Sequence, residues 1–123
     1  MEVKQEFRLY NKIIKYDEYI REYVANNIPS VHRDVRIHLL DESYNLIKYQ
    51  FEAQFNKGNI RNKYINEMIV TISILDYLSN LLIKINKENK KHVITSIHYL
   101  TEIKNMTYAW RKNPEKESWW YLL

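Results

Sequence analysis

Glycine and proline are almost absent from this 123-residue chain, which contains one Gly and two Pro. Strands joined by tight turns depend on both residues, because glycine adopts the positive φ angles of hairpin turns and proline fixes the first turn position. A chain with so few turn residues suits a small number of long helices. Its length is sufficient for one domain with a single core. We therefore expect an all-α fold.

Four breaks divide the sequence into helical segments. Pro29 ends the first segment, because the residue before a proline avoids the helical region. Gly58, in "NKGN" (residues 56–59), suits the left-handed cap of the second segment. The polar "NKENKK" (residues 86–91) ends the third segment, and Pro114 closes the fourth. The predicted helices run from about Lys4 to Asn27, His32 to Phe55, Ile60 to Ile85 and Glu88 to Arg111.

Each segment repeats apolar residues at steps of three and four, the spacing of a stripe on one helix face. Short connections make neighbouring helices run in opposite directions. The sequence therefore predicts an antiparallel up-down-up-down four-helix bundle over residues 1–112. The expected core stripes are Phe7, Tyr10, Ile13, Tyr16, Ile20 and Tyr23; Ile37, Leu40, Tyr44, Ile47, Phe51 and Phe55; Ile65, Met68, Ile72, Leu75, Leu78, Leu82 and Ile85; and Val93, Ile97, Leu100, Ile103, Met106 and Trp110.

Residues 113–123 form a separate aromatic tail, in which charged residues precede "SWWYLL". A segment this apolar is expected to leave water by docking on its own bundle, on a neighbouring subunit or on a partner. The predicted oligomer or partner interface consists of Trp110, Trp119, Trp120 and Tyr121.

The run "MIVTISILDYLSNLLIKI" (residues 68–85) approaches the length of a membrane span. Asp76, Ser79 and Asn80 interrupt it, so we expect no span and place Asp76 on a helix flank or a subunit interface. The chain has no Cys and no apolar run at its start. These two features predict a cytoplasmic protein.

Few residue patterns support metal binding or catalysis. The single Gly excludes a glycine-rich phosphate loop, and no Glu is followed three residues later by a His, as di-iron bundles require. The pairs His38–Glu42 and His98–Glu102 are interpreted as surface contacts. We therefore expect neither a metal nor a cofactor.

Arg33 and His38 match the spacing R-x4-H. This spacing is typical of HEPN ribonucleases, helical bundles in which the Arg and His act on the scissile phosphate across a dimer. A HEPN-type ribonuclease toxin is therefore an alternative function. Positions five apart on a helix lie about 140° apart around its axis, so the two side chains do not share one face. The competing interpretation is that Arg33 and Arg36 are solvated residues of the first helical turn and His38 is a residue on the helix flank.

Lysine and arginine exceed the acidic residues, giving a formal charge of +4 and a pI near 9.2. This modest excess favours polyanionic partners. In an up-down bundle many of the basic residues gather at the two ends, where they either contact phosphates or form a solvated face. The candidate nucleic-acid-binding residues are Lys4, Arg8, Lys12, Lys15, Arg33, Arg36, Lys84, Lys87, Lys90, Lys91, Arg111 and Lys112.

The segment "EIKNMTYAW" (residues 102–110) resembles the E-I-G-x-M-L-G-G-W signature of Avd-like proteins. Lys104, Tyr108 and Ala109 stand where that signature has glycines. Further similar segments follow the family's order: "YDEYIREYV" (residues 16–24), "IPSVHRDVR" (28–36), "LLDESYNLI" (39–47) and "RNKYINEMI" (61–69). The resemblance extends from about Tyr10 to Lys112.

Avd-like proteins are the four-helix-bundle accessory proteins of diversity-generating retroelements, and they are related to bundles encoded in ribosomal RNA intervening sequences. The resemblance implies a homopentamer with a positively charged surface that binds the element's reverse transcriptase and RNA or DNA. It also implies no chemistry of the protein's own, so that the proline-containing turn near Arg33 is not an active site. A purely structural oligomerisation module is a further alternative.

Overall fold

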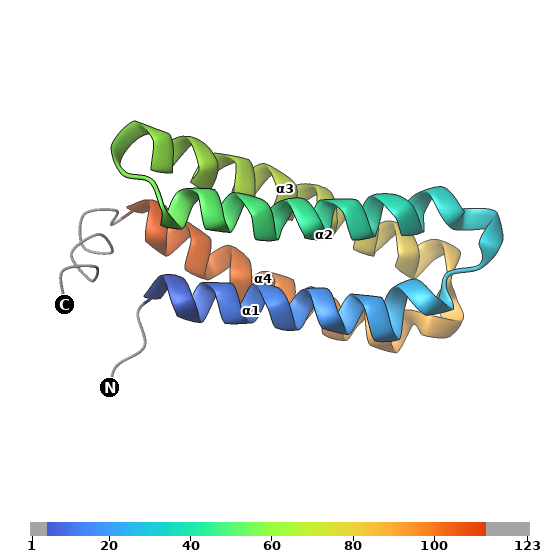
Figure 1. Ribbon diagram of the computed structural model, residues 1–123. Coiled ribbons are helices and arrows are strands. Elements are labelled where there is room, and N and C mark those ends of the chain that lie inside the picture. The colour runs from blue at the N-terminus through green and yellow to red at the C-terminus, as the bar shows by residue number, and fades with distance from the viewer. Residues whose placement is uncertain (1–4, 113–123) are drawn as a thin grey trace.

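The computed structural model describes the backbone of residues 5–112 and the side chains of residues 8–112. Within this range the chain is all-α, with four long helices and no strand (Figure 1). The predicted all-α class is thereby confirmed. The predicted helix boundaries inside the range are within two residues of the observed ones, except for the end of the first helix. That end was predicted at Asn27, whereas α1 ends at Tyr19 and a π-helical turn and a 3-10 turn continue to Asn27. The long helices are α1 (Gln5–Tyr19), α2 (Arg33–Gln54), α3 (Gly58–Ile85) and α4 (Lys90–Lys112).

The four helices lie side by side along one long direction (Figure 1). α1 packs against α2 and α4, and α3 also packs against α2 and α4. Asn86, directly after α3, donates from Nδ2 to the carbonyl oxygen of Asn27 over 2.9 Å. Arg111 in the last turn of α4 donates to Asn66 Oδ1 in the first part of α3 over 3.3 Å. Every helix therefore has two neighbours, and the space between them holds one core.

The connection from α1 to α2 begins with a π-helical turn, Ile20–Val24, and a 3-10 turn, Ala25–Asn27. Ile28 is extended, with φ −80° and ψ 124°, as expected for a residue before proline. The side-chain amides of Asn27 and Asn89 both donate to the carbonyl oxygen of Tyr23, each over 2.9 Å. These asparagines supply donors to a helix end whose carbonyls have lost their intrahelical partners.

Gly58 has the positive φ angle that its position in the sequence predicts, at 60°. It is the first residue of α3, however, whereas α2 is capped at Phe55, with φ −95°. The prediction that Gly58 caps the second helix is therefore wrong. The left-handed residue instead turns the chain into α3.

We expect Gly58→Ala to lower the free energy of unfolding by about 1–2 kcal/mol, the typical cost of a left-handed conformation for a residue with a Cβ. A Cβ placed on Gly58 would meet no atom within 4 Å, so the loss arises from the backbone alone. Urea denaturation measures it. Gly58→Asn is the control and should lose less, because asparagine tolerates this conformation better.

Three of the four helices bury the stripe that the sequence predicts. Ile13 and Tyr16 of α1 are buried, as is Ile20 in the π-helical turn that follows, whereas Tyr23 in that turn is more than one-third exposed. The Phe7 side chain lies outside the described side chains. The buried predicted residues of α3 and α4 are Ile65, Met68, Ile72, Leu75, Leu78, Leu82, Val93, Leu100, Ile103 and Trp110.

The predicted core stripe of α2 is wrong. Four of its six members, Ile37, Tyr44, Phe51 and Phe55, are exposed, while Leu40 and Ile47 are partly buried. The face turned to the core has a less apolar composition, comprising Val35, Leu39, Ser43, Leu46, Gln50, Ala53 and Gln54. Polar members of that face have partners inside the protein, since Ser43 donates to Asp17 Oδ1 over 2.8 Å.

A buried arginine connects three helices at one end of the core. Arg61 in α3 is 1% exposed. Its Nε donates to the carbonyl oxygens of Ala53, over 3.3 Å, and Asn56, over 3.1 Å. The guanidinium carbon lies 5.7 Å from the ring centroid of Trp110 in α4. Arg61 therefore satisfies carbonyls at the end of α2 and contributes a cation–π contact to the core.

By length and hydropathy, α3 is the one helix in residues 5–112 that could cross a membrane. This is weak evidence, because the core helix of a folded domain passes the same test. In this structure α3 supplies nine buried residues, among them Ile65, Leu75 and Leu82.

Candidate functional site

A groove with a lysine-rich lining runs along the start of α4. Its lining residues, which we call the lysine groove, are Lys87, Glu88, Lys90, Lys91, Ile94, Thr95 and His98. Lys91, Ile94 and His98 succeed one another at steps of three and four, so they follow one face of α4, and Lys87 lies in the 3-10 turn just before it. Glu88 is the single acidic residue of the lining. The groove therefore combines several cations with one apolar lining residue, Ile94.

The predicted basic stripe on α1 also lines a groove, between α1 and α4. Arg8, Lys12 and Lys15 lie along it, together with Asn11 and Met106. Lys12 forms an ion pair with Glu102 of α4, with 2.6 Å between Nζ and Oε2. Part of the positive charge of this stripe is therefore neutralised within the chain. Lys4 lies outside the described residues.

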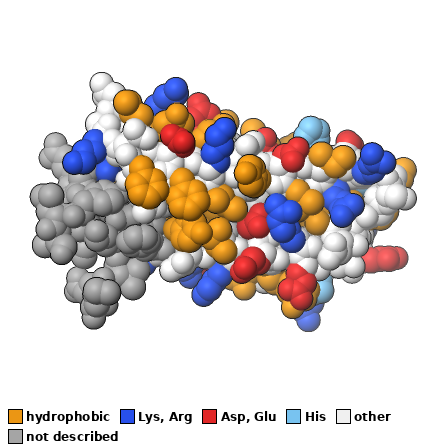
Figure 2. Space-filling model, in the orientation of Figure 1, with side chains coloured by type: hydrophobic (Ala, Val, Ile, Leu, Met, Phe, Trp, Pro, Cys, Tyr) orange, Lys and Arg blue, Asp and Glu red, His pale blue; other side chains and the backbone are white. Residues whose placement is uncertain are grey.

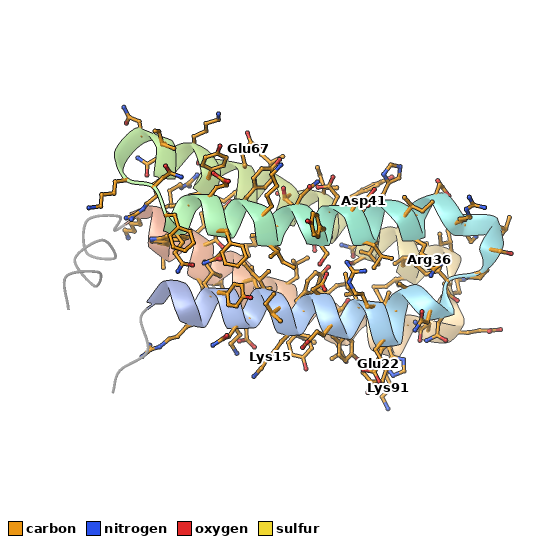
Figure 3. All side chains as sticks on the ribbon, in the orientation of Figure 1. Lys15, Glu22, Arg36, Asp41, Glu67 and Lys91 are labelled. Carbon is orange, nitrogen blue, oxygen red and sulfur yellow. The ribbon has the colours of Figure 1, made fainter. Side chains whose placement is uncertain are left out.

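The remaining candidate basic residues are exposed but are not all free to contact phosphate. Arg111 lies over the ring of Tyr108, 4.9 Å from its centroid, and also binds Asn66. Lys84 and Lys112 are exposed, as are Arg33 and Arg36 in the first turn of α2. Figure 3 places Arg36 on α2 and Lys91 near the start of α4, toward the same end of the molecule.

The residues proposed for nuclease chemistry are exposed in α2. Arg33 is the first residue of the helix, and His38 lies five residues later on the same helix. No group of three or more His, Cys, Asp or Glu side chains suited to a metal ion occurs within the described part of the chain. Burial, together with the neighbouring carboxylates of Asp17 and Asp76, raises the pKa of the Tyr16 hydroxyl, which therefore stays protonated at neutral pH.

Two rows of exposed apolar side chains, one on α2 and one on α3, face outward from the bundle. The sequence did not predict either row as a surface. Figure 2 shows hydrophobic side chains gathered on the face over α1 and α2. Eight of the twelve large hydrophobic side chains that are exposed among the described residues belong to these stripes. The α2 stripe is Ile37, Tyr44, Phe51 and Phe55, and the α3 stripe is Ile60, Val70, Ile74 and Tyr77.

The α2 stripe continues across to α1. Tyr10 packs on Phe51 with 5.1 Å between ring centroids, and Phe51 stacks on Phe55 at 6.3 Å. A shallow groove beside these rings is lined by Tyr44, Ile47, Lys48, Phe51 and Glu52. The heptad spacing of Ile37, Tyr44 and Phe51 could have indicated an exposed helix-pairing seam, but the same residues fit a core stripe equally well.

One of the four residues predicted for the oligomer or partner interface is buried inside the bundle. Trp110 is 1% exposed and packs on Arg61 inside the bundle, so we remove it from the interface set. Trp119, Trp120 and Tyr121 lie outside the described residues. Asp76, predicted on a helix flank, is exposed and lies beside Ser73 and Lys104 in a small cavity between α3 and α4.

Comparison of the chain with protein-family models, with curated proteins and with solved structures gives no match.

Proposed function

We propose that this chain is a non-enzymatic, self-assembling antiparallel up-down-up-down four-helix bundle that binds nucleic acid in the cytoplasm. We further propose that it acts as an accessory protein to the reverse transcriptase of a diversity-generating retroelement, as its resemblance to Avd-like proteins implies. Template RNA or its cDNA copy would be the nucleic acid. The antiparallel arrangement is supported by the polar contacts that bring the ends of α3 and α4 to their neighbours.

The lysine groove is the observation that carries the nucleic-acid part of this proposal. Lys87, Lys90 and Lys91 line one groove with a single acidic neighbour, Glu88. Phosphate contacts of this kind fix a strand on a protein without reading its sequence. Ile94 supplies an apolar surface within the groove, against which a sugar or a base edge fits.

Binding of a labelled single-stranded RNA should weaken as salt is raised, because each neutralised phosphate releases condensed counterions. Three lysine contacts correspond to a slope of roughly −2 in log affinity against log salt for a single strand. Fluorescence anisotropy over a salt series measures this slope. Lys87→Gln combined with Lys91→Gln should make it shallower by roughly one unit.

The matched control is Lys57→Gln combined with Lys104→Gln, which removes the same charge from exposed residues outside the lysine groove. This control should leave the slope near that of the parent chain. Equal effects of the two variants would mean that net charge, and not the groove, determines binding. Salt-insensitive or absent binding would contradict the nucleic-acid part of the proposal.

The reverse-transcriptase part rests on the resemblance alone. Sedimentation of the chain mixed with a reverse transcriptase from a diversity-generating retroelement tests it directly. We expect one faster-sedimenting complex that contains both proteins. Two independent boundaries at micromolar concentrations of each protein would exclude this partner.

A further inference from the structure

The two outward apolar stripes lie on neighbouring helices but face different directions around the molecule. Tyr44 and Phe55 of the α2 stripe are 64% and 74% exposed, and Tyr77 of the α3 stripe is 65% exposed. The stripe positions on each helix are separated mainly by steps of three, four or seven residues, so each set shares one helix face. Exposed apolar side chains that gather along one helix face, unlike ones scattered singly, are typical of interaction surfaces. One chain thus presents two such surfaces.

Contacts within the α2–α3 hairpin show which residues of the two helices lie at the same height. Arg61 binds the carbonyl oxygens of both Ala53 and Asn56, and the rings of Tyr49 and Tyr64 stack 6.2 Å apart. Counting from the tyrosine pair in opposite directions along α2 and α3 brings members of the two stripes level to within two residues. The level pairs are Phe55 with Ile60, Tyr44 with Val70, and Ile37 with Tyr77.

Charged residues on the same outward faces are complementary in this register. Lys48 is level with Glu67, and Glu52 is level with Lys63, again to within two residues. Figure 3 shows Glu67 on α3, on the side of the molecule away from α1. The ion pairs among the described side chains join Lys12 to Glu102 and Arg21 to Asp17, so none of these four charges is in an ion pair within that part of the chain. Lys63 lies over the Tyr64 ring, 5.4 Å from its centroid. All four charges lack an acidic or basic partner there that a second molecule would have to displace.

We propose that the α2 stripe of one copy packs against the α3 stripe of a second copy of this chain, with Lys48 opposite Glu67 and Glu52 opposite Lys63. This inference rests on the self-assembly and the antiparallel arrangement proposed above, and it names the surfaces that would meet. The occupant is a second copy because α3 itself presents a complementary order of charges and an exposed apolar residue level with three of the four members of the α2 stripe.

The register also determines the form of the assembly. The contact joins two different surfaces, so it is heterologous and generates either a closed ring or an open filament. The intermolecular pairs coincide in height with the pairs inside one hairpin. This pairing therefore relates successive copies by rotation about an axis parallel to the helices with little translation along it. Such a rotation favours a ring over a filament, and the ring closes when the rotation angle is a whole fraction of a full turn.

Charge reversal tests the pairing in the full chain. Lys48→Glu and Glu67→Lys each place like charges opposite one another, and each should raise the concentration of half-assembly by roughly tenfold. The double variant, Lys48→Glu with Glu67→Lys, restores opposite charges and should return that concentration to within roughly threefold of the parent value. Sedimentation velocity over a concentration series measures all four proteins.

Glu18→Lys and Lys104→Glu are the matched controls, because both residues are exposed and lie on α1 and α4. Each should assemble like the parent chain. If the parent assembles but the single reversals do not differ from it, the interface is wrong and self-assembly stands. If the double variant is not rescued, the α2-to-α3 pairing is wrong, and a pairing of α2 with itself or with residues 113–123 replaces it.

A monomeric parent chain at all concentrations would overturn both this inference and the proposed self-assembly. The apolar contacts provide a second measurement. Tyr44→Ser and Tyr77→Ser each remove a large exposed side chain from one stripe, and each should abolish assembly at concentrations where the parent is fully assembled. Because both side chains face outward, circular dichroism should show unchanged helix content.

Discussion

Arg61→Ala should destabilise the fold by about 3–5 kcal/mol, among the largest effects expected of any single substitution in this chain. Arg61 is buried and its Nε contacts two carbonyl oxygens near the end of α2, those of Ala53 and Asn56. Alanine removes a charged donor from both acceptors and leaves them inside the protein. The loss of one such buried partner typically costs about 1–3 kcal/mol.

Two further losses add to this effect. The guanidinium of Arg61 lies over Trp110, and a desolvated cation–π contact contributes about 2 kcal/mol. Removing the long side chain also leaves a cavity where α2, α3 and α4 meet, and the surrounding helices relax only partly into it. These terms overlap, so the total remains below their simple sum.

Urea denaturation followed by circular dichroism measures the change. Arg61→Lys should fall between the parent and Arg61→Ala, because lysine keeps the charge but lacks the planar donor geometry. Arg36→Ala is the control for loss of an arginine from an exposed position and should change stability by less than about 0.5 kcal/mol. A loss below about 1 kcal/mol for Arg61→Ala would show that Arg61 does not stabilise this end of the core.

The helix boundaries follow from local chemistry and could be predicted from the sequence. Pro29 removes a donor and restricts Ile28 to extended geometry, and Gly58 has the positive φ angle that other residues avoid. The cap position of Gly58 was predicted incorrectly, because its φ angle is compatible with either side of the turn. Deciding between the two sides requires the three-dimensional path of the chain.

The orientation of α2 could not be predicted because it carries two competing stripes. Periodicity analysis selects the more apolar set, which contains Tyr44 and Phe51, yet Leu46 and Ala53 face the core. Contacts with other helices explain why the less apolar face of α2 turns inward. Ser43 binds Asp17 of α1, and the carbonyl oxygen of Ala53 accepts from Arg61 of α3. The apolar spacing within α2 alone cannot predict such contacts between helices.

Of the candidate surfaces, the lysine groove could be predicted from the sequence, whereas the position of Trp110 and the outward apolar stripes could not. The lysines of the α3–α4 connection were selected from the sequence, and Lys87, Lys90 and Lys91 line one groove in the structure. Trp110 was assigned to an interface but is buried, because a tryptophan near a helix end fits either role until its neighbours are known. The pairing of α2 with a second copy became apparent only after both stripes were found to face outward.

Leu46→Ala and Tyr44→Ala together test which face of α2 lies inside, and their effects on stability should differ widely. Leu46 is fully buried, so its truncation removes apolar contacts and leaves a cavity, lowering the free energy of unfolding by about 2–5 kcal/mol. Tyr44 is mostly exposed, and its truncation should change that free energy by less than about 0.5 kcal/mol. Thermal and urea denaturation at concentrations below self-assembly measure both values.

The low concentration matters because Tyr44 also belongs to the proposed interface, where a partner copy would stabilise the folded chain by mass action. Under assembling conditions Tyr44→Ala should therefore lower the apparent melting temperature in a concentration-dependent way, whereas the deficit of Leu46→Ala persists at every concentration. Equal losses for the two variants in the monomer would mean that the sequence-predicted stripe, and not the face containing Leu46, forms the core. The two substitutions thus separate burial within one chain from burial between copies.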